Sequence, residues 1–386
     1  MKIRIKKDQI IEGLQQAGSI IPAKAGAAYL RSIWLNAKDG HISIMTTDAN
    51  TEFTGTYEAE VEEEGLAGVL GRIFVDLIRQ CPAGQLELME DDQQHNLIVR
   101  KGRQGRYKLP VYSSEWFQAF APFPAEDPVL WSGDFLLDLI EKILFCIDDD
   151  EARDAMSCLC FMPRENGKIQ ACGMNGHQFA MLSFINDELC AKLPEKGLLV
   201  QKKYLPDLKK WLPAEDIELN LSDKRLFFKG REGTETLSIV RASNYEYPDY
   251  NVFLSRLEGE APASLEINRK EAIDVLKRLV VFAPESGQPC VLIRFSPKET
   301  TFTARGSDGS ARESMEAMYR GELEEIAFPT RDLLEILNHF SSEKIRMDFT
   351  AAEGPCGISG EDDRDYLVVL MPMRVANELF YPEDNE

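Results

Sequence analysis

The stretch LGRIFVDLIRQCP (70–82) decides the fold, because it recurs twice more along the chain. It returns as QKKYLPDLKKWLP (201–213) and as PTRDLLEILNHFSS (329–342), so that Phe74, Leu205 and Leu333 are 131 and 128 residues apart. The apolar residues of each copy fall on one face of a helix. A repeat of this period predicts tandem domains of similar structure.

A longer amphipathic helix is predicted about sixty residues before each of these segments. The three are DQIIEGLQQAGSII (8–21), SGDFLLDLIEKILFCI (132–147) and NRKEAIDVLKRLVVFA (268–283). Asp8, Ser132 and Asn268 are the predicted N-caps, and Glu271 completes a capping box with Asn268. Each repeat therefore opens with a long helix and contains a second, shorter one.

Alternating apolar and polar residues between the helices predict antiparallel strands, as in HISIMTTD (41–48), GQLELMED (84–91) and KIRMDFTA (344–351). We predict an α+β protein of three domains, 1–125, 126–255 and 256–386, the last with a C-terminal extension at 376–386. In each domain two helices pack on antiparallel sheets. The alternative is chance similarity among α+β segments, which does not account for the shared order and spacing.

Composition restricts the class of protein further. The 386 residues contain no apolar run long enough to span a bilayer, and the N-terminus has no secretion signal, so we expect a cytoplasmic protein. The eight cysteines are scattered, which favours reduced and mostly buried thiols. We find no phosphate-binding loop, dinucleotide fingerprint or zinc spacing, and expect neither an enzyme nor a cofactor.

Charge is unevenly distributed. The formal net charge of −21 argues against a nucleic-acid partner unless basic residues gather on one surface. The second short helix carries Lys202, Lys203, Lys209 and Lys210, whereas acidic runs fall in strands and loops. The alternative is an ordinary solvated helix face. The third short helix weakens the pattern, because its acidic residues outnumber its basic ones.

Four segments together resemble one family: TTDAN (46–50), MNGHQFAM (174–181), YPDY (247–250) and YLVVLMPMRV (366–375). They resemble the β subunit of bacterial DNA polymerase III, the replicative sliding clamp. The resemblance implies the DNA clamp fold and a ring-shaped head-to-tail homodimer, with helices inside and sheets outside. It also implies a non-catalytic processivity factor for DNA replication, with no cofactor or metal.

The implied partners are double-stranded DNA, bound without sequence preference, and proteins that dock through short peptide motifs. These proteins are the DNA polymerase III α subunit, the clamp loader and repair proteins. The implied DNA-binding residues are Lys24, Arg72, Arg79, Lys202 and Lys203. The implied dimer interface sets Tyr107 and Leu109 of one copy against Val281 and Phe282 of the other.

The resemblance also implies a partner-peptide pocket between the second and third domains, in which Arg374 holds a carbonyl or carboxylate group. Its implied lining is Cys160, Met174, Gly176, His177, Gln178, Phe179, Pro248, Val252, Phe253, Val369, Leu370, Met371, Pro372, Met373, Arg374 and Val375. Cys160 and Gln178 replace an aliphatic and a basic residue expected there, so we expect an altered peptide preference.

Several alternatives stay open. His177 is either a turn or rim residue or a catalytic base, and the acidic run 148–151 is either a solvated loop or a metal site. The extension 376–386 either occupies a peptide pocket through Leu379 and Phe380 or is a disordered acidic tail. The alternative function is a monomeric three-domain DNA-binding or scaffold protein.

Overall fold

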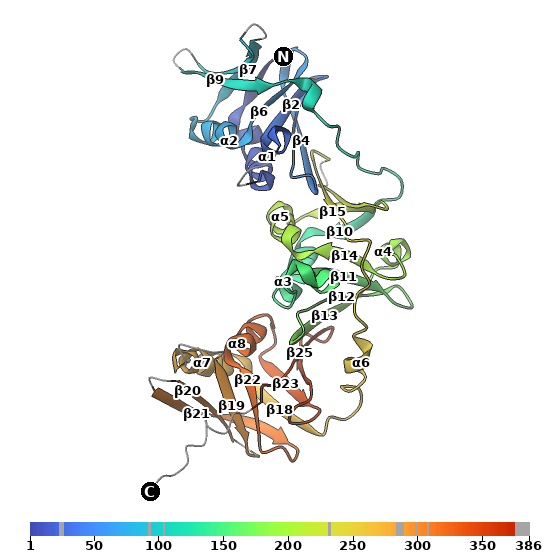
Figure 1. Cartoon of the computed structure of the whole chain (residues 1–386), viewed down its shortest axis with the longest axis vertical. Helices are drawn as coiled ribbons and strands as arrows, with labels where there is room; N and C mark the ends of the chain where they lie inside the picture. The colour runs from blue at the N-terminus through green and yellow to red at the C-terminus, as the bar shows by residue number, and fades with distance from the viewer. Residues whose placement is uncertain are drawn as a thin grey trace. The chain divides into compact units, whose positions relative to one another are not determined.

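The computed structural model describes residues 1–22, 27–91, 94–102, 105–230, 233–282, 289–297, 299–306 and 309–374 (Figure 1). Its strands form one 13-stranded and one 12-stranded sheet in which the pairings of the described strands are antiparallel. The α+β prediction is confirmed. The described helices include none that is long and apolar enough to cross a membrane.

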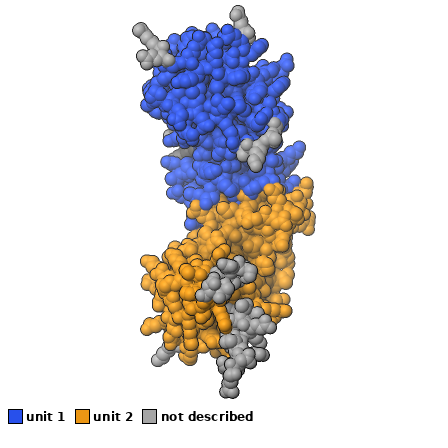
Figure 2. Space-filling view, turned by 60° about the vertical axis from the view of Figure 1, so that its left-hand side comes forward, with its two compact units in different colours: residues 1–138, 203–243 blue, residues 139–202, 244–386 orange. Residues whose placement is uncertain are grey.

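The chain divides into two compact units, 1–138 with 203–243 and 139–202 with 244–386 (Figure 2). The 13-stranded sheet belongs to the first unit and the 12-stranded sheet to the second. Strands from the middle third of the sequence contribute to both sheets. The division into three domains at 1–125, 126–255 and 256–386 therefore stays a prediction from the sequence repeat.

The first third begins with β1 and α1 and ends with β9 and a short 3-10 turn. Its elements are β1 (Lys2–Lys6), α1 (Lys7–Ile20), η1 (Ala28–Arg31), β2 (Ser32–Lys38), β3 (His41–Thr47), β4 (Thr51–Glu58), β5 (Glu60–Glu63), β6 (Gly65–Leu70), α2 (Gly71–Gln80), β7 (Gln85–Asp91), β8 (Asn96–Lys101), β9 (Gly105–Tyr112) and η2 (Ser114–Trp116).

The middle third repeats this order and adds two short helices, α4 and α6. Its elements are β10 (Val129–Ser132), α3 (Gly133–Leu144), η3 (Glu151–Ser157), β11 (Cys158–Pro163), β12 (Lys168–Met174), β13 (Gln178–Ile185), α4 (Asp187–Lys192), β14 (Leu198–Gln201), η4 (Lys202–Tyr204), α5 (Leu205–Trp211), β15 (Asp216–Leu221), β16 (Arg225–Gly230), β17 (Glu235–Val240) and α6 (Asn251–Leu254).

The last third follows the same order again. Its elements are β18 (Ala263–Asn268), α7 (Arg269–Leu279), η5 (Val280–Phe282), β19 (Cys290–Phe295), β20 (Glu299–Gly306), β21 (Gly309–Arg320), β22 (Glu325–Pro329), α8 (Thr330–Asn338), β23 (Lys344–Phe349), β24 (Cys356–Gly360) and β25 (Tyr366–Leu370). In all three, a strand and a long helix precede further strands, a short helix and three final strands.

The predicted caps are only partly present. Asn268 Oδ1 accepts a hydrogen bond from Glu271 N at 3.1 Å, and Ser132 Oγ accepts one from Phe135 N at 3.2 Å. Asp8 is not an N-cap, because β1 runs directly into α1 at Lys7. The capping prediction for Asp8 is therefore wrong, and for Asn268 it is confirmed.

The helices bury their apolar faces against the sheets, and α1 and α2 lie side by side (Figure 1). Leu14 of α1 and Phe74 and Ile78 of α2 are fully buried. Each such side chain contributes about 1.5–3 kcal/mol through removal from water. The apolar residues of the amphipathic pattern therefore form part of the core.

Two equivalent strand pairs join successive repeats. In the first unit β17 pairs with β4, with Ser238 opposite Glu52. In the second unit β25 pairs with β13, with Val369 opposite Phe179. Each joint connects the last strand of one repeat to the third strand after the long helix of the preceding repeat.

Two groups of side chains strengthen the β17–β4 joint. Tyr57 Oη donates to Glu235 Oε1 at 2.6 Å. Gly13 leaves the space for this hydroxyl, because a Cβ at that position would lie only 1.7 Å from it. Arg225 Nη2 lies 3.0 Å from Glu52 Oε1, with side chains that are 11% and 19% exposed. Burial lowers the pKa of Arg225, and the nearby Glu52 carboxylate opposes that change.

Replacing Arg225 by alanine is expected to destabilise the first unit, because it leaves the Glu52 carboxylate buried without its partner. We expect a loss of about 3 kcal/mol, or about 6–12 °C in the thermal midpoint of this unit, measured by calorimetry. The double variant R225M/E52Q removes both charges and should recover at least half of the loss. An unchanged midpoint for R225A would show that the ion pair contributes nothing.

Candidate functional site

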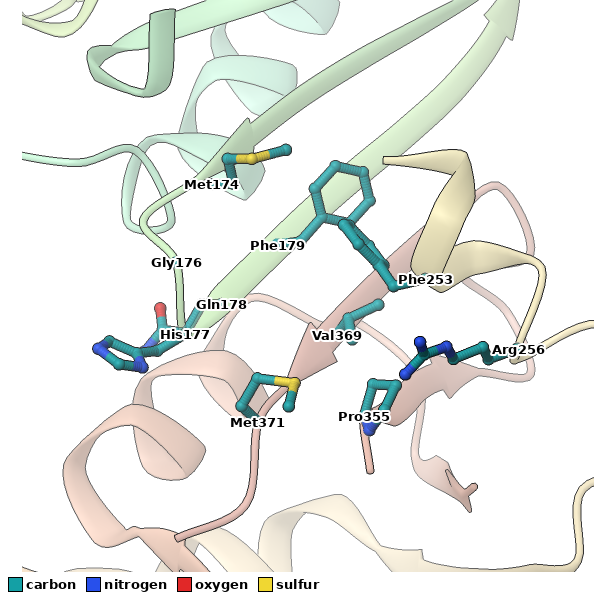
Figure 3. A pocket seen from close by; sticks show the side chains of 10 residues that line it. All are labelled: Met174, Gly176, His177, Gln178, Phe179, Phe253, Arg256, Pro355, Val369 and Met371. Carbon is teal, nitrogen blue, oxygen red and sulfur yellow. The ribbon is translucent and has the colours of Figure 1, made fainter. Parts of the chain in front are cut away.

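An apolar pocket lies within the second unit (Figure 3). Its volume is about 170 Å³. The residues that line it are Met174, Gly176, His177, Gln178, Phe179, Phe253, Arg256, Pro355, Val369 and Met371. A concave apolar site with few polar groups is suited to holding apolar side chains of a ligand.

The turn between β12 and β13 shapes one wall of the pocket. Asn175 Oδ1 accepts hydrogen bonds from His177 N at 3.0 Å and from Gln178 N at 2.9 Å. Gly176 has a φ of +90°, a conformation that L side chains rarely adopt. Asn175 and Gly176 therefore stabilise the turn that carries His177.

Aromatic and β-sheet contacts form the rest of the pocket. The ring of Phe179 lies 5.0 Å from that of Phe253, edge to face, and 5.2 Å from that of Tyr250. Val369 stands opposite Phe179 across β25 and β13. Met371 N donates to His177 O at 2.9 Å, which holds Met371 beside the turn. Strand pairing and ring contacts thus fix this part of the lining.

The structure brings eight of the predicted pocket residues together: Met174, Gly176, His177, Gln178, Phe179, Phe253, Val369 and Met371. The other described candidates, Cys160, Pro248, Val252, Leu370, Pro372, Met373 and Arg374, do not line it. Val375 and the extension 376–386, with Leu379 and Phe380, lie outside the described residues.

Physical reasons account for these differences. Cys160 is fully buried opposite Cys172, because β11 is covered on both faces from Cys158 to Phe161. Val252 is 61% exposed. Arg374 is 87% exposed and its Nη2 lies 3.6 Å from Glu353 Oε2. The Arg374 side chain thus lies outside the lining of this pocket.

The prediction missed two lining residues, Arg256 and Pro355. Pro355 immediately precedes β24, and Arg256 follows α6. Arg256 stands three residues after Phe253, and one helical turn brings residues at this spacing to the same face. This spacing was the local sequence signal that Arg256 lies at the pocket. Pro355 had no comparable signal, because only the strand pairing of the last repeat brings it near Val369.

The predicted alternatives for His177 and for a metal site can be compared with the described residues. The exposed His177 ring makes no hydrogen bond or ion pair among them, so no described group orients it as a base. Within the described ranges, no group of three or more His, Cys, Asp or Glu residues is arranged to hold a metal ion. The described cysteines are free thiols, most of them buried.

The predicted DNA-binding residues have different environments. Arg72 and Arg79 are exposed on α2, and Arg79 Nη2 lies 2.9 Å from Asp76 Oδ1. Lys203 Nζ lies 5.3 Å from the centre of the Tyr204 ring. Lys24 lies outside the described residues.

Lys202 is held by its surroundings. Its ammonium donates to Ile147 O at 2.6 Å and lies 2.7 Å from Asp149 Oδ1, and its side chain is only 22% exposed. Burial raises the pKa of the nearby Glu335 carboxyl, Asp332 raises it further, and Lys202 opposes both. The acidic run 148–151 thus partly neutralises a lysine that the sequence presents as a phosphate contact.

The predicted interface residues lie in two different elements, the strand β9 and the 3-10 helix η5. Tyr107 and Leu109 are in β9, where Tyr107 is 42% exposed. Val281 and Phe282 are in η5, where Val281 is 76% exposed. A Cβ at Gly309 would lie 3.5 Å from the Phe282 ring, so Phe282 borders the start of β21.

Comparison with known proteins identifies one family in the first and last thirds of the chain. A family model described as DNA polymerase III beta subunit, N-terminal domain, matches residues 1–121, and one described as the C-terminal domain matches residues 259–374. Together the two matches cover more than half of the chain.

Individual relatives agree. The beta sliding clamp of Caulobacter vibrioides is 23% identical over 384 residues, covering 97% of this chain and all of that protein. That of Streptomyces coelicolor is 25% identical over 390 residues with the same coverage. The solved structure of Caulobacter crescentus pol III beta has a TM-score of 0.87 at 22% identity, covering 97% of this chain and 100% of that chain.

The threefold repeat of helices on antiparallel sheets is the DNA clamp fold of the solved sliding clamps that this chain matches. Such a protein binds and holds its partners and is a processivity factor, not an enzyme. The chain belongs to the DNA polymerase III beta subunit family, the bacterial sliding clamps.

Proposed function

We propose that two copies of this sliding clamp close head to tail into a ring around duplex DNA. Each copy supplies three similar domains, 1–125, 126–255 and 256–386, and the ring holds the replicative polymerase on DNA. Two strand edges support this proposal. They have no partner strand among the described residues, whereas the equivalent edges in the other repeats pair with each other within the chain.

These edges are β9 and β21. Among the described residues, 105–110 of β9 pair with β8 alone, and 309–316 of β21 pair with β20 alone. In the repeat, β9 corresponds to β17 and β25, and β21 corresponds to β4 and β13. Because β17 pairs with β4 and β25 with β13, the repeat favours pairing of β9 with β21 of a second copy.

The repeat also gives a register for that pairing. Ser238 opposes Glu52 in one joint and Val369 opposes Phe179 in the other. The corresponding residues at the free edges are Lys108 and Ser310, which sets Leu109 opposite Gly309 of the second copy. Since Phe282 borders Gly309, Leu109 would pack on Phe282. A heterologous contact of this kind closes a ring when its rotation is right.

Light scattering tests the assembly. A stable ring predicts twice the chain mass of 43.7 kDa. A species of 43.7 kDa at every concentration would overturn the ring and favour a monomeric three-domain DNA-binding or scaffold protein.

Phosphate contacts from Lys24, Arg72, Arg79, Lys202 and Lys203 are the proposed means of holding DNA in the ring. Such contacts position a duplex without reading its bases, which suits a protein that slides. Arg72 has the strongest support, because it is exposed on α2 and has no ion pair among the described residues. Lys202 contributes less while Asp149 binds it.

Asp149→Asn is therefore expected to strengthen duplex binding. Freeing the Lys202 ammonium from its carboxylate should raise affinity for a short duplex about threefold at low salt, measured by fluorescence anisotropy, and steepen the salt dependence by about one phosphate contact. The variant D149N/K202Q provides the control, since it should show no gain. A gain that persists in the double variant would contradict a role for Lys202.

The pocket of the second unit is the proposed docking site for short peptide motifs of the DNA polymerase III α subunit, the clamp loader and repair proteins. Its apolar walls, with two methionines that adapt to different side chains, support binding of several partners. We also propose that the protein acts in the cytoplasm, because the bacterial chromosome lies there.

A further inference from the structure

The pocket contains a single permanently charged side chain. Among the described lining residues, Arg256 is the only lysine, arginine, aspartate or glutamate, and the remaining walls are mostly apolar. Apolar walls supply affinity, whereas one well-placed polar group fixes the orientation of a ligand. The position of Arg256 is therefore informative about the partner.

Backbone hydrogen bonds place Arg256 at the pocket. Leu254 N donates to Tyr250 O at 3.2 Å, and Arg256 N donates to Phe253 O at 3.2 Å. The turn after α6 thus carries Arg256 close to Phe253. Figure 3 shows its side chain extending toward Val369 and Pro355.

Arg256 is also available to a ligand. Its side chain is exposed and makes no hydrogen bond or ion pair with the described residues. Two other arginines nearby in the fold differ: Arg153 Nη1 lies 3.0 Å from Asp148 Oδ2, and Arg374 Nη2 lies 3.6 Å from Glu353 Oε2. Arg256 keeps its donors free for a planar acceptor such as a carboxylate.

We propose that Arg256 is a specificity-determining residue that selects peptides with a carboxylate beside their large apolar side chains. The inference rests on the proposed peptide-docking function of the pocket. It assigns to Arg256 the carboxylate contact that the sequence had suggested for Arg374.

The overall charge makes this selection useful. A chain of formal net charge −21 repels acidic peptides in general. A free guanidinium beside an apolar pocket reverses that effect locally, because charge-assisted and bidentate hydrogen bonds to a carboxylate are stronger than neutral ones. Partial exposure limits the gain to about threefold to tenfold in affinity.

Selection from a random displayed heptapeptide library tests the proposal. The full-length protein, R256Q, R256E and the control R320Q are used as separate baits. Arg320 is exposed in the same unit, outside the pocket, and its replacement changes net charge by the same amount. Wild type and R320Q should select large apolar residues with a neighbouring Asp or Glu. R256Q should lose the acidic preference, and R256E should select Lys or Arg instead.

The outcomes separate two failures. Wild type that selects no apolar peptides would overturn the proposed function of the pocket. Apolar peptides selected without acidic residues, or an acidic preference that survives in R256Q, would overturn the role of Arg256 alone.

A double-mutant cycle on the best peptide measures the contact directly. Replacing its acidic residue by the matching amide should weaken binding to wild type about threefold to tenfold, and should have no effect on binding to R256Q. An equal loss with both proteins would contradict a direct contact.

Discussion

Lys108→Pro is expected to convert the dimer into monomers of 43.7 kDa. Val111 N donates to His95 O, and Leu109 pairs with Leu97 in the same register, so the odd-numbered residues of β9 direct their backbone groups toward β8. The N–H of Lys108 therefore points to the free edge. Proline removes this donor and places its ring where the second copy would approach.

The expected loss is large because both joints of a two-copy ring contain this residue. Losing two to three hydrogen bonds at about 1 kcal/mol each raises the dissociation constant about 100-fold. Lys108→Ala removes the same side chain but keeps the N–H, and should remain dimeric by light scattering. If K108P stays dimeric at the same concentrations as wild type, the two copies do not pair through β9.

Met371→Glu is expected to abolish binding of partner peptides without affecting the dimer. Met371 lines the pocket, is 37% exposed and is fixed by its hydrogen bond to His177 O. A carboxylate in this apolar site must lose hydration whenever an apolar peptide covers it. We expect affinity to fall about 30-fold or more, measured by calorimetry with a peptide selected on the wild type.

Met318→Glu is the matched control for this prediction. Met318 is 56% exposed in the same unit but does not line this pocket. It should bind the peptide as wild type does. Equal losses in M318E and M371E would indicate a general effect of charge, and unchanged binding in M371E would place the peptide elsewhere.

Much of the fold could be predicted from local sequence. The helical periods around Phe74 and Leu333 are repeated, and a repeated local signal is reinforced with each copy. Asn268 was recognisable as a cap because capping depends on a few adjacent residues. Asp8 was misleading, because a strand that runs directly into a helix leaves no place for a cap.

The site was less predictable because it depends on distant contacts. Cys160 was expected to line the pocket, yet it is fully buried, because other parts of the fold cover both faces of β11 there. The charge of Lys202 is visible in the sequence, but its ion pair with Asp149 joins segments more than fifty residues apart. The role of Arg256 depends on a short turn after α6, for which its spacing of three residues from Phe253 was the one local signal.

Retention on circular and linear DNA tests the central claim, that this clamp holds DNA by encircling it. After loading and a wash at high salt, a ring should stay on closed circles and leave linear molecules through their free ends. Phosphate contacts alone weaken steeply with salt on both forms. Survival on circles with loss from linear DNA is the result we predict, and equal loss from both would contradict the ring.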